Sequence, residues 1–262
     1  MTAMVGRLGR AWEAAFAAIE GPEQEARVLH SHYLAYRAAR SHEAQLAGWM
    51  NGDILDVGAG AGYGKRLLNH GARYFPTDLP TGRDMNDARV TRQGVPLVKE
   101  CSVYAIDYED NRFDGCLALS LFEHLKEPDR AFAEIKRVVK PDGMILVVVP
   151  FAFPVHGHPD DYWRWTEEGL KLYFSRHGVE VVECVRSGGT VDSLVLGWNL
   201  FLGRGLFGLP EGWSVARGAA RAVARPFMTL SFLAGNLFAL AVGRVDDGAS
   251  PISVACLGRN KK

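Results

Sequence analysis

The sequence predicts an α/β protein built on a doubly wound, mostly parallel sheet. Short apolar runs alternate with helix-like stretches from about residue 50 to 187, as in strands joined by crossover helices. The run at 144–149 is wholly apolar, which is typical of a central strand covered on both faces. A loop at 58–64 follows the first apolar run and has glycine at every second position. The backbone of that loop is therefore expected to lie very close to a ligand.

Period and punctuation place the individual elements. Strands are expected at 53–57, 73–77, 96–101, 113–119, 144–149, 179–185 and 252–257. Helices are expected at 3–20, 23–49, 62–70, 129–139 and 167–177, the last capped by Thr166. Pro76 lacks a ladder donor, so the second strand is expected to be short or irregular there, and 141–143 is expected to form a tight turn. Ligands of such sheets bind at the carboxyl ends of the strands.

Composition excludes some classes of function. The 262 residues include 30 Lys and Arg and 30 Asp and Glu, so the net charge is zero. A mainly electrostatic nucleic-acid binder would need a basic surface, and we expect no nucleic-acid partner. The cysteines form no CxxC pair and no zinc spacing, which favours reduced thiols in a cytoplasmic protein: Cys101, Cys116, Cys184 and Cys256. Charged residues interrupt the N-terminal stretch, so no signal peptide is expected.

The glycine loop does not have the register of a dinucleotide fingerprint. A Gly-x-Gly-x-x-Gly pattern that starts at Gly58 needs glycine at 63, where Tyr63 stands. Patterns that start at Gly60 or Gly62 need glycine at 65 or 67, which are lysine and leucine. An NAD-dependent enzyme is therefore disfavoured.

The sequence instead contains Asp56-x-Gly58-x-Gly60-x-Gly62, and Asp78 ends the second strand. Phe113-Asp114, Leu121-Phe122-Glu123-His124-Leu125 and the run at 134–143 follow. Over about residues 50–187 this pattern resembles the class I S-adenosylmethionine-dependent methyltransferases, in particular the type 11 group. The resemblance implies a Rossmann-like methyltransferase fold with a seven-stranded sheet, and S-adenosyl-L-methionine as the cofactor.

The resemblance also implies roles at this edge of the sheet. The glycine loop would wrap the methionine part of the cofactor, and Asp78 would accept hydrogen bonds from both ribose hydroxyls. Asp56 would hold the ammonium, directly or through water, or the backbone amides of the loop. Ser102 stands where the family commonly has an aspartate for adenine, so Val103 and Leu79 are expected to contact adenine instead. The expected cofactor-binding residues are Asp56, Gly58, Ala59, Gly60, Gly62, Asp78, Leu79, Ser102, Val103, Leu119 and Ser120.

Histidines are the candidate catalytic residues, because their ordinary pKa lies near neutral and methyl transfer to a hydroxyl needs a base. The candidates are His124, after the fourth strand, and His156 and His158, after the fifth. For His124 a structural role and a catalytic role stay equally open. No metal site is expected, since the spacing of His156, His158 and Asp160 is short.

The loop at 156–165 is the expected acceptor site. Tyr162, Trp163 and Arg164 are the expected substrate-binding residues, because aromatic faces and a planar guanidinium suit sugars and carboxylates. A self-packed loop with Arg164 paired to an aspartate is the alternative. The pattern His-Gly-x-Pro-x-Asp-Tyr-Trp-Arg resembles methyltransferases of bacterial surface-polysaccharide and secondary-metabolite clusters, which implies O-methylation of a sugar or other small polar acceptor by in-line displacement.

We expect a single methyltransferase domain over 1–262. It comprises an N-terminal helical cap at 1–50, a cofactor-binding core at 51–189, an apolar helical insertion at 190–248 and a closing strand with a tail at 249–262. The insertion is expected to form a helical pair on the sheet, a homodimer contact or a peripheral contact at the inner face of the membrane, but not a membrane span. The alternative function is a methyltransferase-like, non-catalytic binding or scaffold protein that uses these helices for a partner or a membrane surface.

Overall fold

The chain forms two compact units in a computed structural model. The structure describes residues 27–60, 62–79, 99–157, 159–202, 214–243 and 248–262. Unit 1 comprises Met1–Ala38 and Gly188–Ile252, and unit 2 comprises Ala39–Ser187 and Ser253–Lys262. The expected helix at 3–20 lies outside the described residues, and the single-domain organisation stays a prediction.

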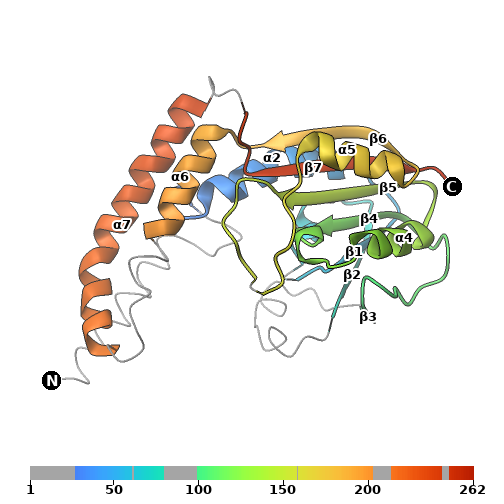
Figure 1. Cartoon of the computed structure of the whole chain (residues 1–262), viewed down its shortest axis with the longest axis horizontal. Helices are drawn as coiled ribbons and strands as arrows, with labels where there is room; N and C mark the ends of the chain where they lie inside the picture. The colour runs from blue at the N-terminus through green and yellow to red at the C-terminus, as the bar shows by residue number, and fades with distance from the viewer. Residues whose placement is uncertain (1–26, 61, 80–98, 158, 203–213, 244–247) are drawn as a thin grey trace. The chain divides into compact units, whose positions relative to one another are not determined.

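Unit 2 is built on one sheet with the strand order β3-β2-β1-β4-β5-β7-β6 (Figure 1). The strands from β3 to β5 run parallel, and β7 runs antiparallel to both β5 and β6. The bounds are β1 Asp53–Val57, β2 Arg73–Asp78, β3 Lys99–Glu100, β4 Phe113–Leu119, β5 Val139–Pro150, β6 Val179–Ser187 and β7 Ser253–Asn260. The predicted fold class is confirmed, although only two of the described residues belong to β3.

Helices cover both faces of this sheet. The helices α4 (Pro128–Val138) and α5 (Glu167–Arg176) pack on one face of the sheet. Phe132 of α4 and Phe174 of α5 belong to the apolar cluster on that face. The end of α2 (Tyr33–Ala47) and Met50 pack with the alternate set of strand side chains, including Ile54 and Leu117. Because successive side chains of a strand point to opposite faces, the two apolar clusters lie on opposite sides of the sheet. As predicted, the Thr166 hydroxyl caps α5 by accepting a hydrogen bond from Gly169 N.

Three local predictions are wrong. The helix expected at 62–70 is only the 3-10 turn η2 (Tyr63–Arg66), preceded by Gly62 in the left-handed region. In the described part of the helix expected at 23–49, residues 27–32 are not helical and α2 begins at Tyr33, because His30 Nδ1 accepts the His32 N–H and competes with helical bonding. The turn expected at 141–143 lies inside β5, which starts at Val139 and absorbs Asp142 (φ 60°) where its register against β4 shifts.

β2 continues through Pro76, contrary to the irregular strand that the sequence predicts. The Thr77 carbonyl faces the β1 side, where it accepts from Ala59 N, and the Asp78 carbonyl faces β3. Alternation along the strand turns the Pro76 nitrogen toward β3, which pairs only with Thr77 and Asp78. The missing donor of proline therefore breaks no described pairing.

Unit 1 contains the helices α6 (Thr190–Leu200) and α7 (Ser214–Val242), which pack together. Buried Asn199 donates to Asn236 Oδ1 at 3.0 Å, and Asn236 donates to the Val28 carbonyl at 2.7 Å. This polar link ties both helices to the residues before α2. Among the residues that the structure describes, we find no helix with the length and apolarity that a membrane span needs.

Candidate active site

The glycine loop leaves β1 in a backbone conformation that favours glycine. Gly58, Gly60 and Gly62 have φ angles of 66°, 50° and 74°. A Cβ on Gly58 would lie 2.9 Å from Leu121 Cδ1, so the loop is packed directly against the segment after β4. Ala59 N donates to the Thr77 carbonyl at 3.0 Å, which ties the loop to β2.

Asp56 lies below this loop and is 1% exposed. Its Oδ2 accepts the Tyr74 hydroxyl at 2.5 Å, whereas its Oδ1 has no hydrogen-bond partner among the described residues. A Cβ on Gly64 would collide with the same carboxylate. Burial raises the pKa of Asp56 to about 7. The Tyr74 hydrogen bond lowers this pKa, and repulsion from the Asp78 carboxylate raises it further. An acceptor of this kind suits a cationic donor such as an ammonium.

Asp78 closes the other side of the loop. Its Oδ2 accepts from Gly60 N at 2.8 Å, and its Oδ1 accepts from Leu79 N at 2.7 Å. Each carboxylate oxygen keeps a second lone pair, and the partly exposed carboxylate lies at the strand end where ribose hydroxyls are expected. Leu79 is exposed beside it.

The remaining predicted cofactor residues lie at neighbouring strand ends. The Ser102 hydroxyl accepts from Tyr104 N at 3.2 Å within a turn, and Val103 is buried. Leu119 ends β4, and Ser120 has a φ of 49° while its N–H donates to the Val148 carbonyl. A non-glycine residue held at positive φ is the kind of local strain that gathers at functional sites. The structure thus brings the predicted residues to one edge, while their individual roles stay predictions.

S-adenosylmethionine fits this edge on two observations. The orphaned Asp56 Oδ1 matches a ligand ammonium, and the left-handed glycines present a backbone with no side chain in the way. Asp56, Asp78 and the glycine loop would therefore hold the cofactor.

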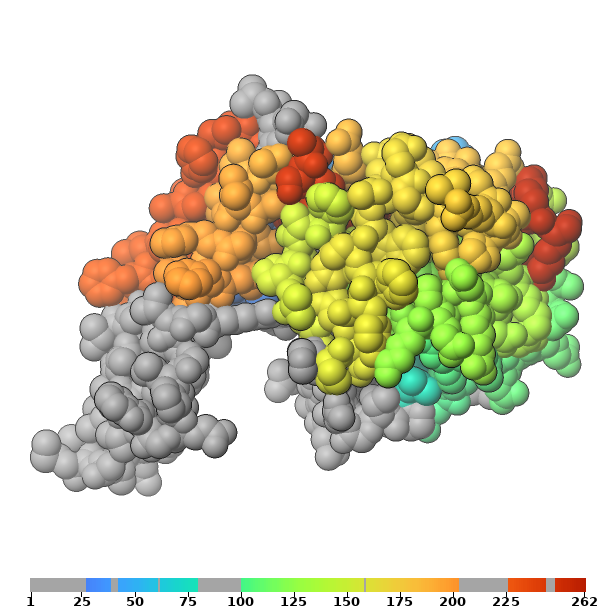
Figure 2. Space-filling view, viewed as in Figure 1, coloured from blue at the N-terminus to red at the C-terminus, as the bar shows by residue number. Residues whose placement is uncertain are grey.

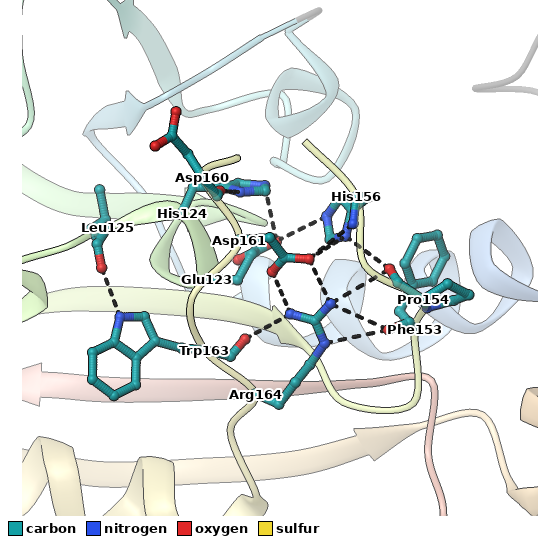
Figure 3. A network of polar contacts seen from close by, with 10 residues as sticks. All are labelled: Glu123, His124, Leu125, Phe153, Pro154, His156, Asp160, Asp161, Trp163 and Arg164. Atoms are coloured by element: carbon teal, nitrogen blue, oxygen red, sulfur yellow. Dashed lines mark hydrogen bonds and ion pairs between the residues drawn. The ribbon is translucent and has the colours of Figure 1, made fainter. Parts of the chain in front are cut away.

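A cluster of one carboxylate and two imidazoles lies beside the loop after β4 (Figure 3). Glu123, within η3 (Phe122–His124), is 0% exposed, and neither of its oxygens accepts a hydrogen bond from a described residue. Nε2 of His124 and Nε2 of His156 each lie 3.7 Å from Glu123 Oε1. The structure therefore brings together two of the predicted catalytic histidines, and His158 lies outside the described residues.

The outer nitrogens of both rings are held by acceptors. His124 Nδ1 bonds to the Asp160 carbonyl, and His156 Nδ1 lies 3.2 Å from the Pro154 carbonyl and 3.4 Å from Asp161 Oδ2. Interaction with the Glu123 carboxylate raises the pKa of His156, with burial opposing it and Asp161 adding to it.

Arg164 is engaged inside its own loop. Its guanidinium forms two parallel contacts to Asp161, at 2.5 and 2.8 Å, and also donates to the carbonyls of Phe153 and Trp163 (Figure 3). The hydrogen bonds from Arg164 outweigh the effect of burial and hold the pKa of the Asp161 carboxyl well below its usual range. Arg164 thus has the self-packed arrangement that the sequence left open, and its acceptor-binding role stays a prediction.

The aromatic residues of this loop are also anchored by their polar ends. Trp163 Nε1 donates to the Leu125 carbonyl at 2.7 Å, and the Tyr162 hydroxyl donates to Asp160 Oδ1 at 2.5 Å. Both side chains nonetheless remain exposed. The segment between β5 and α5 lies at the surface of unit 2, where its yellow-green to yellow atoms are in view (Figure 2). Tyr162 and Trp163 can therefore present ring faces to an acceptor.

The sequence interpretation missed the roles of Tyr74 and Glu123. Tyr74 is the only described side chain that hydrogen-bonds the Asp56 carboxylate, and its strand position gave no signal of that. For Glu123 the only signal was its position among the apolar residues of Leu121-Phe122-Glu123-His124-Leu125.

Comparison with known families gives a match that includes the glycine loop and the ends of β1, β2 and β4. Residues 55–147 match the family described as "Methyltransferase domain". An uncharacterised methyltransferase of Mycobacteroides abscessus is 33% identical over 127 residues, which cover 46% of this chain and 46% of that protein. A phosphatidylethanolamine N-methyltransferase of Cereibacter sphaeroides is 30% identical over 107 residues, covering 38% of this chain and 52% of that protein. The matched region spans about half the length of each of these two relatives.

Solved structures share the fold at low sequence identity. The [4+2]-cyclase SpnF is 18% identical with a TM-score of 0.52, over 86% of this chain and 82% of that chain. A geranyl diphosphate methyltransferase in complex with GPP and sinefungin is 13% identical with a TM-score of 0.50, over 86% and 78%. Likeness at this level shows the fold alone.

The sheet order, the glycine loop and the strand-end acids define a Rossmann-like methyltransferase fold with its ligand edge at the carboxyl ends of β1, β2 and β4. Together with the family match over residues 55–147, they support a class I S-adenosylmethionine-dependent methyltransferase domain in that part of the chain. The family and the fold imply S-adenosylmethionine as its cofactor.

Proposed function

We propose that the protein transfers a methyl group from S-adenosylmethionine to a hydroxyl of a sugar or another small polar acceptor. The observation that carries this proposal is the position of the Glu123–His124–His156 cluster. It begins two residues after Leu121, whose side chain packs against Gly58 of the glycine loop. Candidate proton acceptors therefore lie next to the expected methyl donor.

The chemistry asks little of the protein beyond alignment and proton removal. S-adenosylmethionine supplies an electrophilic methyl group on a positively charged sulfur. The acceptor oxygen forms a bond to that methyl carbon as the carbon–sulfur bond breaks and its electrons return to sulfur. The hydroxyl proton passes to Nε2 of His124 or His156, whose Nδ1 atoms are held by acceptors. The products are the methyl ether, S-adenosylhomocysteine and a proton.

Two observations bear on the acceptor. The exposed rings of Tyr162 and Trp163 favour a ring-shaped polar molecule such as a sugar. The Cereibacter relative is named for N-methylation of phosphatidylethanolamine, so an amine is the competing acceptor. The paired imidazoles favour oxygen, because a hydroxyl needs a base more than a neutral amine does.

Cofactor binding is the first test. Titration calorimetry with S-adenosylmethionine and S-adenosylhomocysteine should give binding to the wild type, and Asp78→Ala should weaken it strongly. Affinity unchanged in Asp78→Ala would remove Asp78 from the ribose site. No binding by the wild type would favour the alternative, a methyltransferase-like binding or scaffold protein.

The acceptor atom is tested with S-adenosylmethionine carrying an isotope-labelled methyl group. Candidate sugars and amines are incubated with the protein, and mass spectrometry locates the label. Label on oxygen supports the proposal, and label only on nitrogen contradicts it. His124→Ala and His156→Ala, compared at saturating cofactor, identify the base; full turnover in both variants would show that neither is needed.

We also propose a cytoplasmic protein whose unit 1 rests on the inner face of a membrane. Large apolar side chains are exposed along α6 and α7, which lie side by side as the orange and red-orange atoms of Figure 2. They are Leu194, Trp198, Phe201, Phe227, Leu230, Leu237 and Phe238. The sequence of α7 before Pro226 adds Arg217, Arg221 and Arg225, a composition that suits anionic lipid.

Sedimentation with vesicles tests this contact. The wild type should pellet with phosphatidylglycerol-containing vesicles, and a Phe227→Ser, Phe238→Ser double variant should not. Leu172→Ser removes an equally exposed leucine from α5 in unit 2 and should pellet as the wild type does. If the wild type does not pellet with vesicles but is a dimer by light scattering, this face is a homodimer contact instead.

A further inference from the structure

We propose that Glu123, His124 and His156 bind a divalent transition-metal ion beside the methyl-transfer site. One ligand atom from each residue lies within 4.8 Å of the other two. The sequence predicts no metal site, because the candidate ligands near one another in the chain, His156, His158 and Asp160, have a spacing that is too short. The fold instead brings His156, after β5, to a glutamate and a histidine that follow β4.

The first argument is the state of the Glu123 carboxylate. The residue is 0% exposed, and both of its oxygens lack a hydrogen-bond partner among the described residues. Burying a polar group without a partner costs several kcal/mol, so such groups in native proteins are nearly always paired or bound to an ion. The carboxylate thus needs a positive partner at Oε1, which is the oxygen that both imidazoles approach.

The second argument is the orientation of the two rings. Because carbonyl oxygens can only accept, the contacts to Asp160 O and Pro154 O place the proton of each ring on Nδ1. In the neutral form of each ring, Nε2 then has a lone pair directed toward Glu123, and an ion bound there would take the place of a second ring proton. Metal-binding histidines characteristically donate their other N–H to a carbonyl or carboxylate in this way.

The distances agree with ligands that share an ion. At 3.7 Å, the two Nε2–Oε1 separations are too long for hydrogen bonds. Tetrahedral ligands at about 2.1 Å from a metal lie roughly 3.4 Å apart. A small shift of flexible side chains therefore suffices. His124 and His156 are each about a quarter exposed, which leaves a route for an ion.

Charge and ligand type identify the class of ion. With neutral imidazoles, the carboxylates of Glu123 and Asp161 outweigh the guanidinium of Arg164, and the cluster carries one negative charge. Two imidazoles and one carboxylate suit Zn²⁺, Co²⁺, Mn²⁺ or Fe²⁺, whereas Mg²⁺ prefers oxygen ligands. Three protein ligands leave a coordination position open. If the proposed function holds, a bound ion occupies the Nε2 lone pairs of both histidines, and it would then activate the acceptor hydroxyl in their place by lowering its pKa.

Cobalt(II) is the probe, because its visible spectrum reports imidazole and carboxylate ligands. The full chain is stripped with a chelator, dialysed and titrated with Co²⁺. We expect one ion per chain, displaced by Zn²⁺ but not by Mg²⁺ at equal concentration. Glu123→Gln and His156→Ala should each weaken binding at least about tenfold. His70→Ala removes an exposed imidazole outside the cluster and should bind as the wild type does.

The contrary outcomes are equally defined. A wild type without stoichiometric Co²⁺ at micromolar concentration overturns the proposal, and so do Glu123→Gln and His156→Ala variants that bind Co²⁺ like the wild type. Using two variants guards against one that fails to fold, and thermal unfolding identifies such a case. The Co²⁺ spectrum needs no cofactor and no turnover. Loss of the metal proposal is therefore distinguishable from loss of the proposed function, which is decided by S-adenosylmethionine binding and methyl transfer.

Discussion

The glycine loop after β1 and the loop after β5 lie on the same unit but are built differently. The first depends on backbone: left-handed glycines and main-chain N–H groups that donate to Asp78. The second depends on side chains, with Arg164, Asp161 and His156 bonded to one another and to carbonyls. The donor site is therefore encoded in a short stretch of sequence, and the acceptor side in contacts between distant segments. The following four changes test that difference, from the largest expected effect to the smallest.

Arg164→Ala should have the largest effect on stability. Asp161 is nearly fully buried, and the change would leave its carboxylate without its main partner. We expect a loss of about 3 kcal/mol in the free energy of unfolding, at the low end for a broken buried pair because Arg164 itself is partly exposed. Urea unfolding measures it. Arg164→Lys keeps the charge but cannot form the two parallel hydrogen bonds to Asp161, so it should lose less stability than Arg164→Ala. A loss below about 0.5 kcal/mol in Arg164→Ala would show that the loop is not held by this pair.

Gly64→Ala should weaken the methyl-donor site, because there is no room for a Cβ at this position. The new Cβ would collide with the Asp56 carboxylate and with Leu117, both buried. Overpacking of this kind costs about 1–3 kcal/mol, and we expect weaker S-adenosylmethionine binding in calorimetry. Gly71→Ala is the matched control, since its Cβ would meet open space. Equal behaviour of the two variants would contradict a tightly packed loop.

Asp56 should make cofactor binding depend on pH. With a pKa of about 7, Asp56 is largely protonated below neutrality, and an ammonium binds only the ionised form. Affinity should therefore fall by up to about tenfold for each pH unit below 7. Calorimetry at pH 6 and pH 8 checks this. Asp56→Asn should bind more weakly with no such slope, and a wild-type affinity independent of pH would argue that Asp56 only holds the loop.

Asp53 should affect stability and leave both loops unchanged, because it lies at the opposite end of β1. Burial raises its pKa, but hydrogen bonds from Arg112 and Arg73 outweigh burial and place the pKa below the ordinary value of 3.8. A lowered carboxyl pKa stabilises the fold above the unfolded-state value and loses that contribution as pH falls through the folded-state value. Asp53→Asn should thus be less stable than wild type at pH 7, and the gap should shrink below about pH 4. A gap that stays constant would exclude the ion pairs as its cause.

Local patterns made much of the fold predictable. The limits of β4 are as expected, because Phe113 and Leu119 bound an apolar run between polar turns. The short turn at 63–66 was not predictable from helix-forming residues alone, since the tight contact at Gly64 depends on Asp56. In the site, the strand-end acids could be placed by counting along strands. The partnership of Glu123 with His156 could not, because it arises only when the loops after β4 and β5 meet.

The position of β7 has a consequence for how the sheet assembles during folding. β7 pairs with both β5 and β6, and among the described strands β6 pairs only with β7. The chain forms β6 first and then passes through residues 188–252 before β7 begins. Until residues 253–260 arrive, β5 presents an open edge and β6 has no neighbour. Contacts this distant in sequence slow folding and leave strand edges exposed to aggregation, so unit 2 is most vulnerable while residues 188–252 are being made.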